Sequence, residues 1–285
     1  MSKIWDLRSM LQWMTGYLQE KRIADARLEA ELLLAQAVGQ DRLYLYTHYD
    51  QPLTPAELAR LKSWLLRRVA GESAAVIFGE KEFMGLPFHV TSDVLVPRGD
   101  TEVWVAEVLA RRGEQPQRVL DVGTGSGAIL GSLLHYRANW QGVAVDISPA
   151  ALGVAAENFD ALGVASRIEL RESDLFAALA GETFDILVSN PPYIPTGAIP
   201  TLAAEVQNEP HTALDGGTDG LDVMRRLVAQ AAEYVVAGGL CAVEIGYEQG
   251  RAVEALVQAD GRYTVPVICR DLSGHDRAVL WEVKA

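Results

Sequence analysis

Residues 118–127 read RVLDVGTGSG and decide the fold. The run RVLDV is apolar and β-rich, and the glycine-rich turn from Asp121 to Gly127 leads into a helical stretch. Glycines let a backbone take turns forbidden to other residues and approach a ligand closely. In α/β proteins ligands bind at this end of a strand. The segment predicts a ligand site at one edge of a parallel sheet, and a tight connection without a ligand is the alternative.

Short β-rich runs and amphipathic or Ala-rich stretches alternate over the rest of the chain. The runs are RVLDV (118–122), GVAVD (142–146), RIELR (167–171), FDILVS (184–189), LCAVEI (240–245), YTVPVI (263–268) and AVLWEV (278–283). Such alternation is typical of an α/β fold in which helices cover both faces of a doubly wound parallel sheet. Residues 194–219 lack periodicity and are rich in Pro and Gly, which predicts a functional loop over the site.

The first seventy or so residues carry helical patterns instead. Apolar side chains recur at three- and four-residue steps from Ile4 to Leu18 and from Leu28 to Leu33, and Gly39 is a plausible stop. The sequence TPAE at 54–57 is a capping box with Pro at the first helical position. A small helical domain is therefore expected at the N-terminus.

The pattern changes to alternating apolar residues between Phe83 and Val96, which predicts a short hairpin between two domains. The expected organisation is a helical domain at 1–75, a β-hairpin linker at 76–98 and the sheet domain at 99–285.

Composition excludes several classes of protein. The net charge is −13 and the pI is near 4.9. Direct binding of nucleic acid is disfavoured because proteins that neutralise phosphates usually present a basic stripe. No apolar run is long enough to cross a bilayer and the first ten residues are charged, so a cytoplasmic protein is expected. Cys241 and Cys269 lie in apolar runs as small hydrophobes, and no metal site is expected.

An acid follows the second strand at a spacing typical of nucleoside sites. The strand GVAVD ends at Asp146, roughly twenty residues after the glycine turn. A carboxylate there can accept hydrogen bonds from both ribose hydroxyls, which implies an adenosine-bearing cofactor. A helix N-cap is the alternative role, for which Ser148 is the better residue. Residues 173–176 (SDLF) can read the adenine amino edge and sandwich its ring, or form a solvent-facing turn.

The spacing of the glycines argues against NAD. Gly123, Gly125 and Gly127 fall as G-x-G-x-G, whereas the dinucleotide fingerprint places its third glycine one residue later, beneath a pyrophosphate. The arrangement favours a cofactor without phosphate whose amino-acid end lies along the turn.

The sequence NPPY at 190–193 follows the fourth strand, at the same sheet edge as Asp146. This segment is typical of sites that bind a substrate with a planar nitrogen. Such a nitrogen is a poor nucleophile because its lone pair is delocalised. The side-chain oxygen of Asn190 and the carbonyl of Pro191 can accept two N–H bonds and aim the lone pair at a sulfonium methyl. Prolines preset the carbonyl geometry, and Tyr193 offers a flat wall for an amide or a base. A strand terminator is the structural alternative.

These residues resemble the HemK/PrmC-type release factor glutamine methyltransferases, and the resemblance covers nearly the whole chain. It includes the glycine turn, NPPY and DARLEAELL at 25–33. It also includes GEKEF at 79–83, LVPRGDTE at 95–102, EP at 209–210, ALDGG at 213–217, DGL at 219–221, EIGY at 244–247 and DLSGHDR at 271–277.

The resemblance implies a Rossmann-like class I methyltransferase domain with a seven-stranded, mostly parallel sheet, and a small N-terminal helical domain that recognises substrate. It implies methyl transfer from S-adenosyl-L-methionine to the glutamine of the Gly-Gly-Gln loop in peptide chain release factors. The cofactor would contact Gly123, Thr124, Gly125, Ser126, Gly127, Asp146, Leu175 and Asn190. The glutamine would be held by Asn190, Pro191, Pro192 and Tyr193, with Asn190, Pro191 and Tyr193 catalytic.

The sequence departs from the family pattern at two positions. Gly99 stands where members usually carry proline, and Leu175 stands where some carry an aromatic ring, which changes the expected adenine stacking. Arg98 and Glu102 either line the mouth of the site or form an ion pair between domains. His275 is expected in a structural hydrogen bond or a surface turn.

Rival functions share part of this pattern. Methylation of a ribosomal-protein glutamine is the nearest alternative. A DNA amino methyltransferase would share the NPPY motif, but this chain has no inserted basic recognition domain. The spacing of its glycines also differs from that of an NAD-dependent oxidoreductase.

Overall fold

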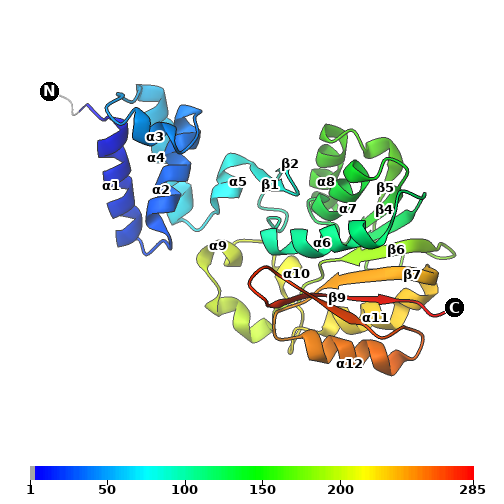
Figure 1. Ribbon diagram of the computed structural model, residues 1–285. Helices are drawn as coiled ribbons and strands as arrows, with labels where there is room; N and C mark the ends of the chain where they lie inside the picture. The colour runs from blue at the N-terminus through cyan, green and yellow to red at the C-terminus, as the bar shows by residue number, and fades with distance from the viewer. Residues whose placement is uncertain (1–3) are drawn as a thin grey trace. The chain divides into compact units, whose positions relative to one another are not determined.

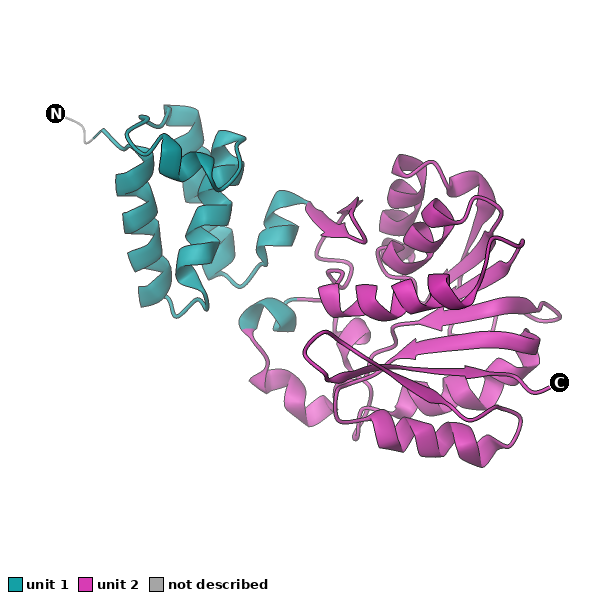
Figure 2. Ribbon diagram, in the orientation of Figure 1, with its two compact units in different colours: residues 1–79, 204–208 teal, residues 80–203, 209–285 magenta. Residues whose placement is uncertain are grey.

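The computed structural model describes residues 4–285 and divides into two compact units. The helical unit comprises the chain up to Gly79 together with Ala204–Asn208, and the sheet unit comprises Glu80–Ala203 and Glu209–Ala285 (Figure 2).

The helices of the helical unit begin and end where the sequence provides caps. Asp6 and Thr54 each form a capping box, and Gly39 ends a helix with φ +67°. Ile4 lies outside the first helix and is exposed. The elements are α1 (Leu7–Glu20), α2 (Ala26–Val38), α3 (Tyr44–Thr47), α4 (Pro55–Val69) and α5 (Ala74–Phe78). Their inward faces bury an apolar core of their own.

A segment far along the chain belongs to the helical unit. Helix α9 (Ala204–Gln207) places Glu205 against the guanidinium of Arg68, which also donates to Glu29 at 2.7 Å. Asn208 donates to the carbonyl of Ala70 at 3.3 Å. Arg68 is therefore a buried cation that carries two carboxylate partners, as burial of a charge requires.

The sheet unit begins with the expected hairpin. Strands β1 (Glu80–Phe83) and β2 (Leu86–His89) pair antiparallel through a two-residue turn at Met84 and Gly85, both with positive φ. The pairing covers residues 80–89, so the hairpin begins and ends earlier than the stretch from Phe83 to Val96 indicated by the sequence, and Val94 to Val96 belong to no strand.

The larger sheet has seven strands in the order β5-β4-β3-β6-β7-β9-β8, and β9 runs antiparallel to both strands beside it, β7 and β8 (Figure 1). This confirms the predicted mostly parallel α/β fold. The strands are β3 (Arg118–Val122), β4 (Gln141–Asp146), β5 (Ile168–Glu172), β6 (Phe184–Ser189), β7 (Val235–Glu244), β8 (Val267–Arg270) and β9 (Asp276–Glu282).

Helices cover both faces of this sheet. Apolar residues of β3 alternate, so that Val119 packs with one set of helices and Leu120 with the other. One face packs against α6 (Gly99–Arg111), α7 (Ala128–Tyr136) and α8 (Pro149–Ala161), and the other against α11 (Asp222–Tyr234) and α12 (Gly250–Asp260). A short 3₁₀ helix, η1 (Ala165–Arg167), precedes β5.

Three central strands end level with one another. In the register of the sheet, Val122 lies opposite Val145 on one side and Ser189 on the other. The Ser189 hydroxyl donates to the Val122 carbonyl at 2.7 Å. The loops that leave β3, β4 and β6 therefore emerge together at the carboxyl edge, where α/β folds bind ligands.

Two segments differ from their sequence predictions. The run at 263–268 gives a strand only from Val267, because Pro266 has no N–H to donate to a sheet. The expected loop at 194–219 contains short helical turns, namely η2 (Thr196–Thr201), α9 and α10 (His211–Leu214). Each is too short to give a helical period in the sequence.

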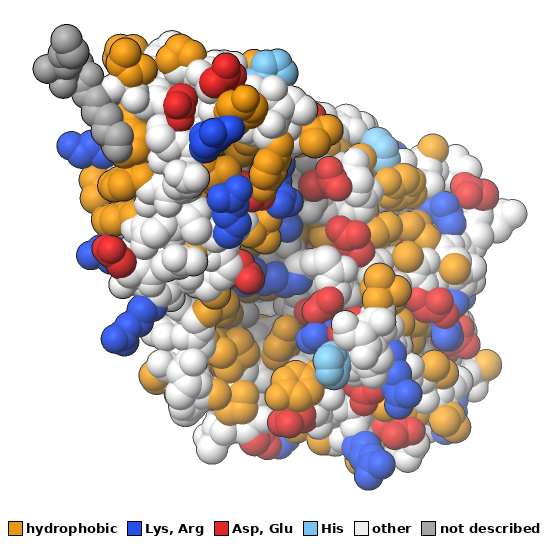
Figure 3. Space-filling model, turned by 60° about the vertical axis from the view of Figure 1, so that its left-hand side comes forward, with side chains coloured by type: hydrophobic (Ala, Val, Ile, Leu, Met, Phe, Trp, Pro, Cys, Tyr) orange, Lys and Arg blue, Asp and Glu red, His pale blue; other side chains and the backbone are white. Residues whose placement is uncertain are grey.

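The surface carries both signs of charge. Figure 3 shows one face, on which Lys and Arg side chains are interspersed with Asp and Glu. None of the helices in residues 4–285 combines the length and apolar content that a membrane span needs.

Candidate active site at the carboxyl edge of the sheet

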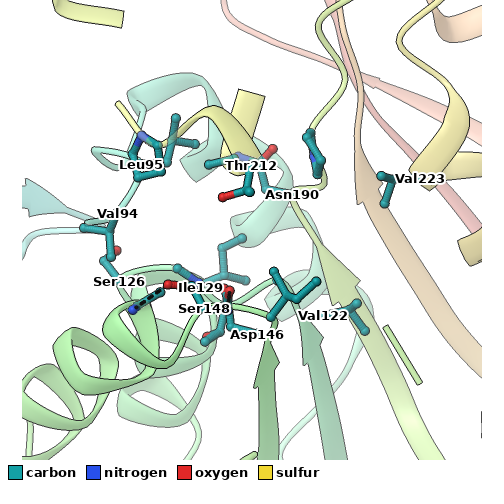
Figure 4. A pocket seen from close by; sticks show the side chains of 18 of the residues that line it. Val94, Leu95, Val122, Ser126, Ile129, Asp146, Ser148, Asn190, Thr212 and Val223 are labelled. Atoms are coloured by element: carbon teal, nitrogen blue, oxygen red, sulfur yellow. Dashed lines mark hydrogen bonds between the residues drawn. The ribbon is translucent and has the colours of Figure 1, made fainter. Parts of the chain in front are cut away.

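The sheet unit contains a cavity of about 380 Å³ at the carboxyl edge of β3, β4 and β6 (Figure 4). This volume lies within the range of small-molecule sites. Gly125, Asp146 and Asn190, which come from the loops after three different strands, all border it. The topology therefore brings Gly125 and Asn190, which are far apart in the sequence, to one cavity.

The glycine turn forms one wall of the cavity. Gly123 and Gly125 have φ of +74° and +55°, and a Cβ at either would meet no atom within 4 Å. The left-handed backbone, not crowding, therefore explains glycine at these positions. The amides of Gly123 and Thr124 donate to the Val145 carbonyl at 2.8 and 3.0 Å, which fixes the turn on β4.

Asp146 closes the end of β4 beside this turn. Its two carboxylate oxygens accept the amides of Gly125 and Ser148, each at 2.9 Å. Burial raises the pKa of the Asp146 carboxyl, although these amide bonds favour its ionised form. Each oxygen keeps lone pairs for further donors, because a carboxylate has about four acceptor sites. The predicted N-cap role falls to Ser148, which accepts the Ala151 amide at 3.2 Å and starts α8.

The turn after β5 supplies another part of the wall. Leu175 borders the cavity with φ +51°, and Asp174 borders it while its carboxylate pairs with Arg226 at 2.8 Å. Phe176 is buried and stacks on Tyr234, so it anchors the turn and does not face the cavity. An aliphatic side chain, not an aromatic ring, thus faces the cavity from position 175.

Residues 190–193 leave β6 at the opposite side of the cavity. Asn190 and Pro192 border it, whereas Pro191 and Tyr193 do not. Within residues 4–285, no hydrogen bond of the chain engages the Asn190 carboxamide or the Pro191 carbonyl. Asn190 therefore presents an unengaged carboxamide at the cavity, whereas Pro191, although its carbonyl is not hydrogen-bonded within the described chain, is buried beside it in the sequence.

Gly127 has a different place from the other glycines of the turn. It caps α7 with φ +77° and does not border the cavity. A Cβ there would lie 2.6 Å from the ring of Phe159 in α8. Its absence of a side chain allows α7 and α8 to pack closely.

We expect Gly127→Ala to destabilise the protein by about 1 to 3 kcal/mol, because overpacking against Phe159 adds to left-handed strain. The measurement is the shift of the urea unfolding midpoint. Gly153→Ala is the matched control, since a Cβ at Gly153 in α8 would meet nothing within 4 Å, and alanine there should be neutral or stabilising. An unchanged midpoint with weakened cofactor binding would instead assign Gly127 to the ligand.

Arg98 lies at the cavity and also forms an ion pair. Its guanidinium donates to the buried Glu209 carboxylate at 2.6 Å, and both residues belong to the sheet unit. Glu209 additionally accepts the Val96 amide at 3.2 Å. Glu102 accepts the Met84 amide at 3.0 Å and so holds the β1–β2 turn. His275 donates its amide to Asp271 at 2.9 Å, in the surface turn expected for it.

Asp121 is fully buried beneath the turn. Its carboxylate accepts the Thr124 hydroxyl at 2.8 Å, and burial raises its pKa to about 7. The residue therefore secures the glycine turn from below.

Several cavity residues were not predicted as site residues from the sequence. Val94, Leu95, Ile129, Thr212 and Val223 border the cavity from segments that no local pattern connects (Figure 4). Leu95 lay in a stretch matching the family, yet its place in the wall depends on how residues 90–98 run after β2.

Two family models match the chain. The PrmC N-terminal domain matches residues 9–79, and the methyltransferase small domain matches residues 101–217.

Curated relatives match over nearly their full length. The release factor glutamine methyltransferase of Geobacter sulfurreducens is 44% identical over 278 residues, covering 97% of this chain and 96% of that protein. The protein of the same name from Moorella thermoacetica is 48% identical over 255 residues, covering 89% and 90%.

Among solved structures, a methyltransferase from Pyrococcus furiosus aligns with a TM-score of 0.54 at 15% identity, covering 79% of this chain and 98% of that one. At that identity the likeness concerns the fold. The relatives decide the family, because their identity extends over both units of the chain. The chain belongs to the release factor glutamine methyltransferase family.

Proposed function

We propose that this protein transfers a methyl group from S-adenosyl-L-methionine to the side-chain amide nitrogen of the glutamine in the Gly-Gly-Gln motif of peptide chain release factors. The observation that carries the proposal is the Asn190 carboxamide, which borders the same cavity as Asp146 and has no hydrogen bond within the described chain. The names of the relatives supply the substrate class.

The cavity fits the cofactor that the family uses. The wall formed by Gly123, Thr124, Gly125 and Ser126 lets a ligand approach the backbone, and Asp146 retains acceptor capacity toward ribose hydroxyls. Leu175 offers an apolar surface to the adenine. When bound, the cofactor supplies an electrophilic methyl group on a sulfonium.

Residues 190–193 would hold the glutamine. The Oδ1 atom of Asn190 and the carbonyl of Pro191 would accept the two N–H bonds of the amide, orient the nitrogen lone pair toward the methyl donor and stabilise the positive charge that develops on the nitrogen, which then sheds a proton. Pro192 borders the cavity beside Asn190. Tyr193 does not line the cavity, and we assign its ring a place against the glutamine side chain once substrate is bound. A fixed acceptor pair lowers the entropic cost of this alignment.

Residues 1–75 recognise the protein substrate, residues 76–98 link the domains, and residues 99–285 carry out the transfer in the cytoplasm. An independent apolar core supports a separate helical recognition unit.

The test is to incubate the protein with radiolabelled S-adenosyl-L-methionine and a panel of release factors, ribosomal proteins and DNA, and to map the labelled residue. We expect label on the Gly-Gly-Gln glutamine and none on a release factor with alanine at that position. Label on a ribosomal-protein glutamine or on a base of DNA would replace the proposed substrate.

A further inference from the structure

Residues 190–196 belong to no strand or long helix, so other segments must fix the acceptor pair. On one side they run beside residues 214–217. The Ile194 amide donates to the Leu214 carbonyl at 3.0 Å, and the Gly216 amide donates to the Ile194 carbonyl at 2.9 Å. The bridge between Ile194 and Asp215 is parallel. The chain leaving the acceptor pair is thus attached to the ALDGG stretch.

Backbone packs directly on backbone beneath this attachment. A Cβ at Gly216 would lie 2.8 Å from the Pro192 carbonyl oxygen, and one at Gly220 would lie 2.2 Å from the Tyr193 carbonyl oxygen. Real Cβ atoms do not come so close to carbonyl oxygens, and Gly220 also has φ +76°. Because neither glycine has a side chain, the backbone at Gly216 and Gly220 packs directly against the backbone of residues 192–193 and fixes its position.

The side chain of Gln249, just ahead of α12, joins the pieces. Its Nε2 donates to the Tyr193 carbonyl at 2.9 Å and to the Gly220 carbonyl at 3.2 Å, and its Oε1 accepts the Gly246 amide at 2.8 Å. Two carbonyls face one end of the carboxamide and one N–H faces the other, so only one orientation satisfies all three. This one half-buried side chain thus connects the acceptor turn to Gly220 and to the loop after β7.

The far end of Tyr193 is held as well. Its hydroxyl donates to Glu244 Oε1 at 3.3 Å, while Glu244 Oε2 accepts the Thr101 hydroxyl at 2.6 Å and the Trp104 indole N–H at 2.8 Å. Glu244 is 2% exposed, so this carboxylate sits among donors in the core. Tyr193 is therefore fixed at its carbonyl by Gln249 and at its hydroxyl by Glu244.

We propose that Gln249 is a positioning residue for methyl transfer: it touches neither cofactor nor substrate, and holds the acceptor turn at residues 190–193 in register with the methyl donor. The inference rests on the proposed function, since it gives the turn the task of aligning an amide. A displacement of about 1 Å in a catalytic group can cost on the order of a hundredfold in rate.

The experiment compares Gln249→Glu and Gln249→Ala with wild type. The Glu variant has the same shape but sets an oxygen against two carbonyl oxygens, and the Ala variant removes all three bonds. We expect kcat toward a Gly-Gly-Gln substrate to fall about ten- to a hundredfold, with KM and calorimetric cofactor affinity within about threefold. Gln258→Glu is the matched control, because Gln258 is exposed on α12 and its side chain hydrogen-bonds only to Glu254, at 3.4 Å, among the described residues.

A second readout needs neither cofactor nor substrate. Hydrogen–deuterium exchange in a peptide covering residues 189–200 should speed up in both Gln249 variants. The Ile194 and Thr196 amides directly follow the acceptor turn, and their bonds to the Leu214 and Gly217 carbonyls should open more often once the Tyr193 carbonyl is released. Apart from the Gly246 amide, which loses its own acceptor in Gln249→Ala, and the segment around Gly220, exchange elsewhere and the urea midpoint should stay near wild type. This readout decides the positioning claim even if the wild-type protein methylates no glutamine, which would defeat only the proposed function.

Two results would overturn the inference. One is wild-type kcat in Gln249→Glu. The other is unchanged exchange at residues 189–200 in both variants, which would mean that the turn is fixed without Gln249.

Discussion

Asn190→Ala should lower kcat for glutamine methylation by about 10² to 10³, the usual cost of removing one preorganised group that stabilises charge in the transition state. Asn190 is the side chain from residues 190–193 that borders the cavity with an unengaged acceptor oxygen in the described chain. Cofactor affinity should change by less than about tenfold, because a single neutral hydrogen bond is worth about 1 kcal/mol net. Single-turnover methyl transfer and calorimetry with the cofactor measure the two quantities.

Two further variants make that result specific. Asn190→Asp keeps an acceptor oxygen and should retain more activity than the Ala variant. Asn139→Ala should be neutral, because Asn139 is exposed and, within residues 4–285, its side chain donates only to the Glu114 carbonyl at 3.3 Å. Near-normal turnover in Asn190→Ala would remove this residue from the mechanism.

Asp146→Ala should weaken cofactor affinity about ten- to a hundredfold. The carboxylate contributes charge-assisted hydrogen bonds, and it also holds the Gly125 amide, so its loss loosens the wall that faces the ligand. Calorimetric titration with S-adenosylhomocysteine measures the effect. Asp160→Ala, at an exposed position on α8, controls for the change in net charge. An unchanged affinity would show that the ribose lies elsewhere.

The same carboxylate makes cofactor binding depend on pH. Burial raises the pKa of Asp146, and the ionised form is the one that accepts hydrogen bonds, so affinity should be constant above that raised pKa and decline as the pH falls through it. Asp121, with a pKa of about 7, titrates nearby and contributes to the same profile. In Asp146→Asn, only the pH dependence of cofactor affinity that is due to Asp121 should remain. A profile identical to wild type in that variant would exclude Asp146 as its source.

The fold was predictable because its signals are local. Alternating β-rich and helical runs, the caps at Thr54 and Ser148, and the glycine turn each depend on residues within a few positions of one another. The sequence placed Asp146 and Asn190 at one sheet edge because parallel strands end together. It also gave the family, whose relatives cover nearly the whole chain.

The parts that were not predictable depend on contacts between distant segments. Nothing near Gly127 in the sequence indicates that Phe159 excludes a side chain from it. The ALDGG and DGL stretches were visible as family features. That their glycines pack against the backbone of residues 192–193 is seen only in the folded arrangement of residues 190–220. Likewise, Gln249 has an ordinary sequence context, and only the positions of three backbone groups from separate loops reveal its bridge.

The most direct measurement is a crystal structure of the protein with S-adenosylhomocysteine and a Gly-Gly-Gln peptide. We expect the ribose hydroxyls on Asp146 and the glutamine nitrogen about 3 Å from both Asn190 Oδ1 and the Pro191 carbonyl, facing the cofactor sulfur. A glutamine amide held by other groups, or a cofactor bound away from the glycine turn, would contradict the account.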